Sequence, residues 1–245
     1  MRTTMATNIK TFVNASKKIK ADGRSKIDHE DFFRDPQRPN MIDSDYFYTP
    51  ADGIVLYAKE VNPTEKIIDI KGKFFNLQDL LEDKDFNKRC LVVGVFMTEY
   101  DVHINRIPYS GLLKYKELEP LSTINLPMLA TQDKILKNEF DPSLVDYTKK
   151  NQRMLNTIYS PLLDLRYYVL QIADDDINTI TPFSTIQNFR YSQNVRFSMI
   201  RWGSQCNLIV PLHKNYKFEI FCKERTHVEG GIDRLIKIIK KKENV

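Results

Sequence analysis

The sequence predicts an α+β fold with a mainly antiparallel β-sheet core and short helices. Its 245 residues are 42% hydrophobic and 28% charged, as in a folded globular chain. Short apolar and β-branched runs alternate with turn residues and lack regular intervening helices, which argues against a doubly wound α/β fold. The runs are Ile54–Glu60, Lys66–Ile70, Leu91–Met97, Tyr167–Ile172, Phe197–Trp202 and Cys206–Leu212.

The individual elements differ in how strongly they are marked. Leu91–Met97 is continuously apolar, as a buried strand should be. Asn76 is a good N-cap for a short helix over Leu77–Leu81. Val102 to Asn105 alternate, so a strand there would put His103 and Asn105 on one face. Gly111–Lys116 would form the next strand. Residues 117–153 contain three prolines and no sustained period, which indicates a long excursion or flap.

Both ends of the chain are basic and amphipathic. Residues 1–26 hold seven basic groups and one acidic group. Apolar residues recur at helical spacing in this leader (Ile9, Phe12, Val13, Ile19) and near the C-terminus (Ile232, Leu235, Ile236, Ile239). Two interpretations stay open: two helices docked on the core, or basic ends resting on an anionic membrane surface. The body of the chain has no concentrated basic stripe, so we expect no nucleic-acid partner.

Several functional classes are excluded by composition. Three cysteines without a C-x-x-C pair exclude a disulfide framework or zinc knuckle and suit a reducing compartment. The eight glycines have neither P-loop nor G-x-G-x-x-G spacing. No apolar run reaches the ~18 residues of a membrane helix, and no signal peptide is visible. We expect no metal site and assign no role to three histidines: His29, His213 and His227.

Five motifs follow one another along the chain. They are Phe32–Pro39 (FFRDPQRP), Pro50–Gly53 (PADG), Ile70–Gly72 with the Phe75–Leu81 segment, Asp101–Pro108 (DVHINRIP) with Ser110–Gly111, and Ile200–Ser204 (IRWGS). This ordered set resembles the phosphatidylserine decarboxylase family, in particular its short form. The resemblance spans roughly residues 30 to 231 and is weakest from 117 to 165. It implies an N-terminal segment over residues 1–30 and one decarboxylase domain over 31–245.

The resemblance implies a proenzyme that cuts its own backbone between Gly203 and Ser204. The serine hydroxyl would attack the preceding carbonyl to give an ester, and elimination and hydrolysis would leave a pyruvoyl group at Ser204. The products would be a β chain of residues 1–203 and an α chain of residues 204–245. The hydroxyl needs a base, and the family's aspartate–histidine pair maps onto Asp52 and His103, with the carboxylate orienting the imidazole.

The resemblance also implies the chemistry of the mature enzyme. The substrate amine would form a Schiff base with the pyruvoyl ketone, which accepts electrons as carbon dioxide leaves. His103 is the natural proton donor to the α-carbon. Arg106 is a candidate for holding a substrate carboxylate or phosphate, with a structural ion pair as the alternative, and Asn105 is a weaker substrate-binding candidate.

The leading interpretation is a pyruvoyl-dependent decarboxylase acting on phosphatidylserine, cytoplasmic and peripheral on the membrane surface. Two departures keep alternatives open. Gln205 stands where the short form usually has arginine, and the basic leader replaces an apolar membrane segment. The alternatives are the same chemistry on a free amino acid, and an uncleaved, inactive relative that binds membrane surfaces. A homodimer is expected by analogy with the family.

Overall fold

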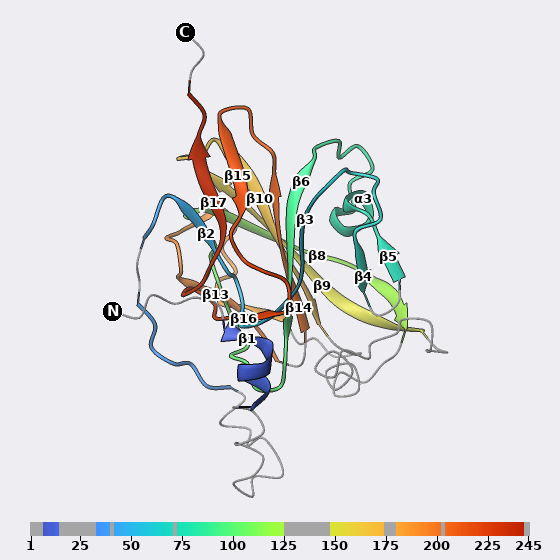
Figure 1. Ribbon diagram of the computed structural model, residues 1–245. Coiled ribbons are helices and arrows are strands. Elements are labelled where there is room, and N and C mark those ends of the chain that lie inside the picture. Colours follow the sequence, from blue (N-terminus) through green and yellow to red (C-terminus); the bar gives the residue numbers. More distant parts are fainter. Residues whose placement is uncertain are drawn as a thin grey trace, which may run out of the picture.

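A nine-stranded antiparallel sheet dominates the computed structural model, which describes residues 7–14, 33–39, 42–70, 73–124, 148–173, 180–201 and 204–242 (Figure 1). The fold class predicted from the sequence is confirmed. The sheet contains, in spatial order, β1 (Thr7–Asn8), β16 (Thr226–Val228), β3 (Gly53–Val61), β6 (Cys90–Met97), β14 (Ser204–Pro211), β10 (Leu165–Ala173), β9 (Thr148–Ser160), β8 (Gly111–Ile124) and β12 (Phe189–Tyr191).

Three smaller antiparallel sheets surround the large one. Their strands are β11 (Ile180–Pro182), β13 (Arg196–Ile200) and β7 (Ile104–Arg106); β15 (Tyr216–Ile220), β17 (Arg234–Lys240) and β2 (Tyr46–Tyr48); and β4 (Ile68–Ile70) with β5 (Lys73–Phe75). Residues 9–14 form a short helix beside β1, and α3 (Leu77–Leu81) lies beside β4 and β5 (Figure 1). The layers therefore enclose both faces of the central strands.

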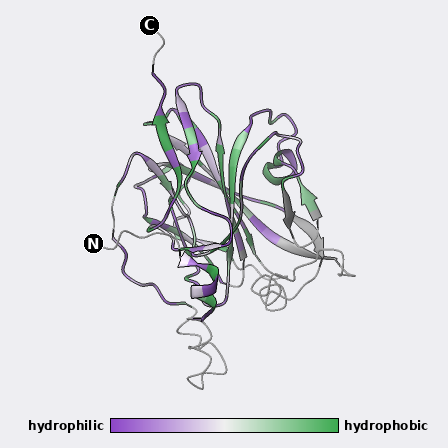
Figure 2. Cartoon of the chain, in the orientation of Figure 1, coloured by the Kyte–Doolittle hydropathy of each residue, from purple (hydrophilic) through white to green (hydrophobic). Residues whose placement is uncertain are grey.

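The apolar core occupies both faces of the large sheet. Along β6, Val93 and Val95 pack into one cluster that includes residues of β2, β15 and β17, whereas Val92 packs into a second cluster beneath α3. Hydrophobic residues, drawn in green, run along the central strands (Figure 2). Burial on both faces explains why the sequence of this strand is continuously apolar rather than alternating.

The predicted helix over Leu77–Leu81 is confirmed together with its cap. The Asn76 side chain accepts from the Asp79 backbone N–H at 2.9 Å, and the Asp79 carboxylate accepts from the Asn76 N–H at 3.4 Å. This reciprocal arrangement satisfies two backbone donors that a helix start otherwise leaves unpaired. The helix buries Leu77, Leu80 and Leu81 against the second cluster.

The predicted C-terminal helix is wrong: residues 234–240 form strand β17, between β15 and β2. Leu235 and Ile236 are fully buried, and a register irregularity between Arg234 and Ile236 lets two consecutive side chains enter the core. The apolar residues of this segment have helical spacing because a bulge interrupts the alternation of a strand rich in β-branched residues. The N-terminal prediction fares better, because residues 9–14 are helical and dock on the sheet; Ile19 lies outside the described residues.

Two further expectations need correction. The flap predicted over residues 117–153 is wrong at both ends, because residues 117–124 extend β8 and residues 148–153 begin β9. Residues 125–147 lie outside the described residues. The strand predicted from Val102 begins only at Ile104, so His103 lies in the preceding loop and shares no strand face with Asn105.

Candidate active site

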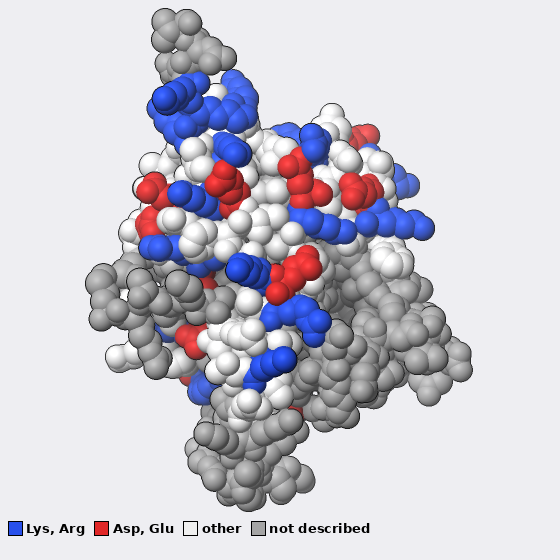
Figure 3. Space-filling model, viewed as in Figure 1, with Lys and Arg blue, Asp and Glu red and all other residues white. Residues whose placement is uncertain are grey.

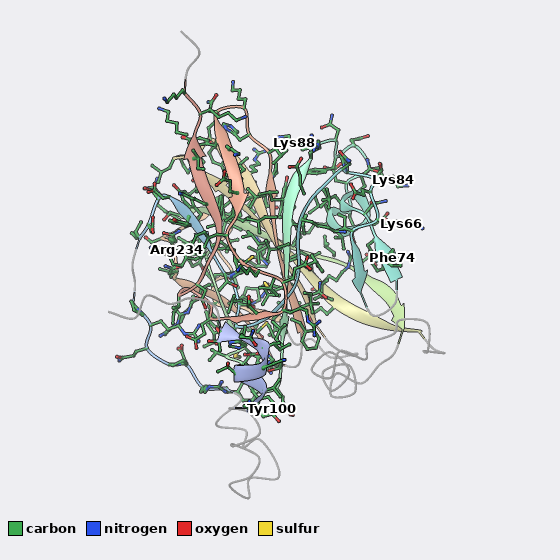
Figure 4. All side chains as sticks on the ribbon, in the orientation of Figure 1. Lys66, Phe74, Lys84, Lys88, Tyr100 and Arg234 are labelled. Carbon is green, nitrogen blue, oxygen red and sulfur yellow. The ribbon has the colours of Figure 1, made fainter. Side chains whose placement is uncertain are left out.

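The predicted site residues gather at one edge of the large sheet, where several strands begin or end. Ser204, the first residue of β14, pairs in register with Met97 at the end of β6 and with Ala173 at the end of β10. On the other side of β6, Ile54 of β3 pairs with Phe96 and with His227 of β16. The loop residue Tyr100 lies at this edge, near the helix of residues 9–14 and opposite Lys88 (Figure 4).

His103 lies one short loop beyond Met97 and is 1% exposed. Its Nδ1 is 3.0 Å from the Ile200 carbonyl oxygen and its Nε2 is 3.0 Å from the Thr98 carbonyl oxygen. Carbonyl oxygens only accept, so both contacts are hydrogen bonds at once only in the imidazolium form. Burial lowers the pKa of His103, while the two carbonyls and the charge of Asp101 raise it in part. Burial therefore opposes the charged form of the ring, while its two carbonyl contacts favour it.

Asp52 does not contact His103, although the sequence predicted an orienting contact between them. Arg38 donates to both carboxylate oxygens of Asp52 at 2.5 and 2.6 Å and to the Gly230 carbonyl at 2.5 Å. The Gly230 N–H donates a further bond to Asp52, at 2.7 Å. Asp52 influences His103 only through space, by raising its pKa. The contact is missing because a bidentate guanidinium occupies the carboxylate.

Gly53 shows why Asp52 sits where it does. Its φ of +148° lies in a region that side chains rarely adopt, and a Cβ there would approach the Phe96 carbonyl oxygen to 2.1 Å. Only glycine lets β3 approach β6 this closely directly after the Asp52 turn.

Asp101 and His227 form a buried aspartate–histidine pair, which the sequence did not predict. His227 Nε2 is 2.6 Å from Asp101 Oδ1, and Asp101 is 1% exposed. Burial alone would lower the pKa of His227, but the hydrogen bond and charge of Asp101 outweigh it, so the pKa is raised. Burial likewise opposes ionisation of Asp101, yet His227 and Thr98 bring its pKa below the ordinary value.

Arg106 and Asn105 point to opposite faces of β7. Arg106, 2% exposed, donates to the Asn194 carbonyl at 3.0 Å and lies 3.7 Å from Asp35. Among the described residues its Nε and Nη2 have no hydrogen-bond partner. Asn105, in contrast, accepts from Gln171 at 2.6 Å and donates to the Pro50 carbonyl at 3.4 Å. Its amide is thus occupied by the scaffold, which disfavours the substrate-binding role predicted for it.

Gly203 lies outside the described residues, and only the backbone position of Ser204 is described. Gln205 is better defined: its amide donates to the Tyr57 hydroxyl at 2.7 Å and to Asn207 at 2.9 Å. The Tyr57 hydroxyl in turn donates to Asn207. This buried network fixes the start of β14, immediately after the predicted cleavage point.

A cavity of about 440 Å³ opens at the same edge. Its lining includes Phe12, Arg34, Arg38, Asp52, Asp101 and His227. The cavity is therefore walled by the N-terminal helix on one side and by ionisable groups of the sheet edge on the other. No cluster of three or more metal-ligating side chains occurs in the part of the chain that the structure describes.

The sequence predicts roles for Asp52, His103 and Arg106, which stay predictions, and gives no sign that Asp101 and His227 form a pair. Asp101 begins the DVHINRIP motif, and His227 has no partner nearby in the sequence. Their contact joins residues 126 positions apart. No local pattern could have signalled it, apart from the fact that the chain has only four histidines.

The fold is an antiparallel β-sheet that brings buried ionisable side chains to the start of β14, an arrangement that suits the active site of an enzyme. The sequence model of the phosphatidylserine decarboxylase family matches residues 30–233. The chain therefore belongs to the phosphatidylserine decarboxylase family, whose members are carboxy-lyases made as proenzymes with a covalent pyruvoyl group.

Individual relatives are similar over most of the chain. A phosphatidylserine decarboxylase proenzyme of Pelagibacter ubique is 29% identical over 72% of this chain and 66% of its own length. One of a Wolbachia species is 27% identical over 82% and 71%. A putative archaetidylserine decarboxylase proenzyme of Methanosarcina barkeri is 29% identical over 86% and 76%. The chain thus spans about two thirds to three quarters of these relatives. No solved structure matches it.

Proposed function

We propose that this chain cuts itself between Gly203 and Ser204 and then decarboxylates phosphatidylserine to phosphatidylethanolamine. The observation that supports this most directly is the register of β14. It brings Ser204 beside Met97, one residue before Thr98, whose carbonyl contacts the buried ring of His103. A serine and a buried base are thereby held at the same strand end by backbone pairing on both sides of β14.

His103 is the proton carrier in this proposal. In the neutral ring, one nitrogen has a lone pair and faces a carbonyl oxygen. A small rotation of the ring away from that carbonyl lets this nitrogen accept the proton of the Ser204 hydroxyl. The resulting imidazolium is stabilised by both carbonyls and can give the proton back in the later protonation step. Asp52 acts from a distance, by adding negative charge that favours the imidazolium.

The residues around Ser204 suit a pyruvoyl group at this position. Ser204 is the first residue of β14, so cutting before it leaves the ladder from Gln205 onward intact. Such a group supplies a ketone that withdraws electrons as carbon dioxide leaves. The scaffold's part is to hold the new chain end, and the Gln205, Tyr57 and Asn207 network does so.

Arg106 binds an oxyanion of the substrate in this proposal. Its side chain is buried, yet two of its nitrogens lack hydrogen-bond partners among the described residues. Guanidinium donors match a carboxylate or a phosphate in a bidentate manner. The names of the relatives from Pelagibacter and Methanosarcina specify serine lipids, whose head group carries both kinds of oxyanion.

Membrane association would take place through the edge that holds the site. No helix among the described residues is long and apolar enough to cross a bilayer. Figure 3 shows Lys and Arg side chains gathered at the end of β17, where Lys240–Lys242 are exposed, but this end lies opposite the site edge (Figure 1). The basic leader enters the fold at the site edge, through residues 7–14. We therefore expect the leader, rather than the C-terminus, to meet the lipid.

The experiment follows cleavage and turnover in the purified full chain. Denaturing gels and intact mass should show fragments of 203 and 42 residues, the smaller one carrying a terminal ketone. Vesicles containing phosphatidylserine should then yield carbon dioxide and phosphatidylethanolamine. A chain that stays intact over days, or a cleaved chain without turnover of serine lipid, would contradict the proposal.

Serine variants provide the matched control. Ser204→Ala should abolish both fragments, because alanine has no hydroxyl to attack the Gly203 carbonyl. Ser192→Ala removes the hydroxyl of an exposed turn serine and should cleave like the wild type. Equal cleavage in both variants would show that the chain is cut at another peptide bond and that the active site lies elsewhere.

A further inference from the structure

His227 is a buried histidine that the proposed chemistry does not use. It lies on β16, next to β3 in the large sheet, and is 7% exposed. Its ring stacks on Phe12 of the N-terminal helix, with ring centroids 4.0 Å apart and an interplanar angle of 11°. Its Nε2 meets Asp101. Two segments far apart in the sequence thus converge on one imidazole.

Asp101 connects His227 to the loop before His103, because its carboxylate contacts both His227 and Thr98. Its Oδ2 accepts from the backbone N–H and from the hydroxyl of Thr98, both at 2.7 Å, while Oδ1 faces His227. The Asp101 backbone N–H also donates to the Thr98 carbonyl at 3.1 Å. The same Thr98 carbonyl contacts His103 Nε2. An unbroken series of contacts therefore connects His227, Asp101, Thr98 and His103.

We propose that His227 is a positioning residue for His103: through Asp101 it fixes the Thr98–Asp101 turn, whose carbonyl orients the His103 ring. The inference rests on the proposed function insofar as His103 is the proton carrier. A buried carboxylate without a compensating cation is costly, so the turn keeps its shape only while Asp101 is neutralised. His227 supplies that cation from a different element of the fold.

Several charges act on this unit besides the pair itself. Asp52 and Glu229 raise the pKa of His227, and Asp233 in turn feels the charge of His227. Arg34 and Arg38 line the cavity beside it. With the pKa of His227 raised and that of Asp101 lowered, both partners are charged in the window between the two values. The ion pair is lost as the pH rises through the His227 pKa, or falls through the Asp101 pKa.

His227→Gln separates the effect of charge from that of hydrogen bonding, because the glutamine amide can still donate to Asp101 but is neutral. Without the cation, the negative field of Asp101 at His103 is no longer offset, so the pKa of His103 should rise by about half a unit to one unit. The acidic limb of self-cleavage should move to higher pH in the same direction. At pH values below the His103 pKa, cleavage should be about threefold to tenfold slower than in the wild type at the same pH, and at pH 8 the two should be equal.

The decisive measurement is NMR titration of the four imidazoles in the uncleaved Ser204→Ala protein, which needs no activity. His227→Gln in this background should raise the pKa of His103, and the matched control His213→Gln, on the distant β14–β15 loop, should not. Asp101→Asn should remove the effect, so that adding His227→Gln changes the His103 pKa no further.

Two results would overturn the inference. One is a His103 pKa that is the same with and without His227, in protein whose circular dichroism shows the native fold. The other is an equal His227→Gln shift in the presence and absence of Asp101, because then the influence would not pass through the carboxylate. Failure of the wild type to cleave counts against the proposed function alone and leaves the coupling between the two rings standing.

Discussion

Two buried arginines, one on each side of the large sheet, are treated in opposite ways by the fold. Arg153, 1% exposed, donates to the Glu119 carbonyl at 2.8 and 3.2 Å, to the Leu80 carbonyl at 3.4 Å and to the Glu82 carboxylate at 2.8 Å. Every nitrogen of its guanidinium is occupied. Arg106 is as deeply buried, but two of its three nitrogens have no hydrogen-bond partner in the described part of the chain.

The difference concerns how fully each guanidinium is paired within the fold. Arg153 donates hydrogen bonds to carbonyls in the last turn of α3. The last carbonyls of a helix have no donors within the helix itself. The Nε and Nη2 groups of Arg106, near the edge that holds His103 and Asp52, have no hydrogen-bond acceptor among the described residues. Burial lowers the pKa of Arg106, and the charges of Arg38 and Arg196 lower it further, while the charges of Asp35 and Asp52 offset part of the shift. Its Nη2 has only a long ion pair with Asp35, at 3.7 Å, so a substrate oxyanion would add the hydrogen bonds that this contact leaves unmade.

The largest expected effect is on the satisfied arginine. Arg153→Met removes the cation from its pair with Glu82 and the hydrogen bonds that Arg153 donates to the Glu119 and Leu80 carbonyls, which should cost about 3 kcal/mol of unfolding free energy. Chemical denaturation of the uncleaved Ser204→Ala protein measures this. Once folded, the variant should cleave itself like the wild type. A loss below about 1 kcal/mol would mean that the network contributes little.

Arg106→Met is the matched test on the other side. Because the wild-type guanidinium is incompletely paired, the unfolding free energy should be no lower than that of the wild type. Turnover of phosphatidylserine should fall about 10- to 100-fold in kcat/KM, the worth of one charge-assisted contact. Arg106→Lys should recover only part of this loss, since an ammonium cannot bind two oxygens in a fork. Unchanged turnover in Arg106→Met would assign Arg106 to structure, like Arg153.

A smaller effect concerns Asp233, another incompletely paired charge near the same edge. Its Oδ1 has no partner among the described residues, and burial, with some help from the charge of Glu229, raises its pKa from 3.8 to about 6. The folded protein therefore holds this proton more tightly than the unfolded chain. The stabilising contribution is complete below pH 3.8 and is lost as the pH rises through about 6.

Asp233→Asn should consequently raise the unfolding free energy at pH 8 by about 1 to 2 kcal/mol, and should have a much smaller effect at pH 4. Denaturation curves at both pH values check it. An equal change in unfolding free energy at both pH values would show that burial does not raise the pKa of the Asp233 carboxyl.

Much of the scaffold could be predicted because its signals lie within short segments of the sequence. The Asn76 cap lies three residues from its partner Asp79, and the apolar run of β6 is contiguous. The order of motifs was likewise enough to indicate the family, and with it His103 and Ser204. The environment of those residues was not predictable, because it is built by contacts across the sheet. Arg38 reaches Asp52 from 14 residues away and His227 reaches Asp101 from 126.

By itself, the chain's amino-acid order determined a β-rich fold, a capped helix and a set of residues whose chemistry suits decarboxylation. Only the tertiary structure decided that residues 234–240 form a strand, that Asp52 pairs with arginine, and that Asp101 pairs with His227. The physical reason is the range of the forces involved. Periodicity and capping act over a few residues, whereas the partner of a buried charge is whichever group the strand register brings within reach.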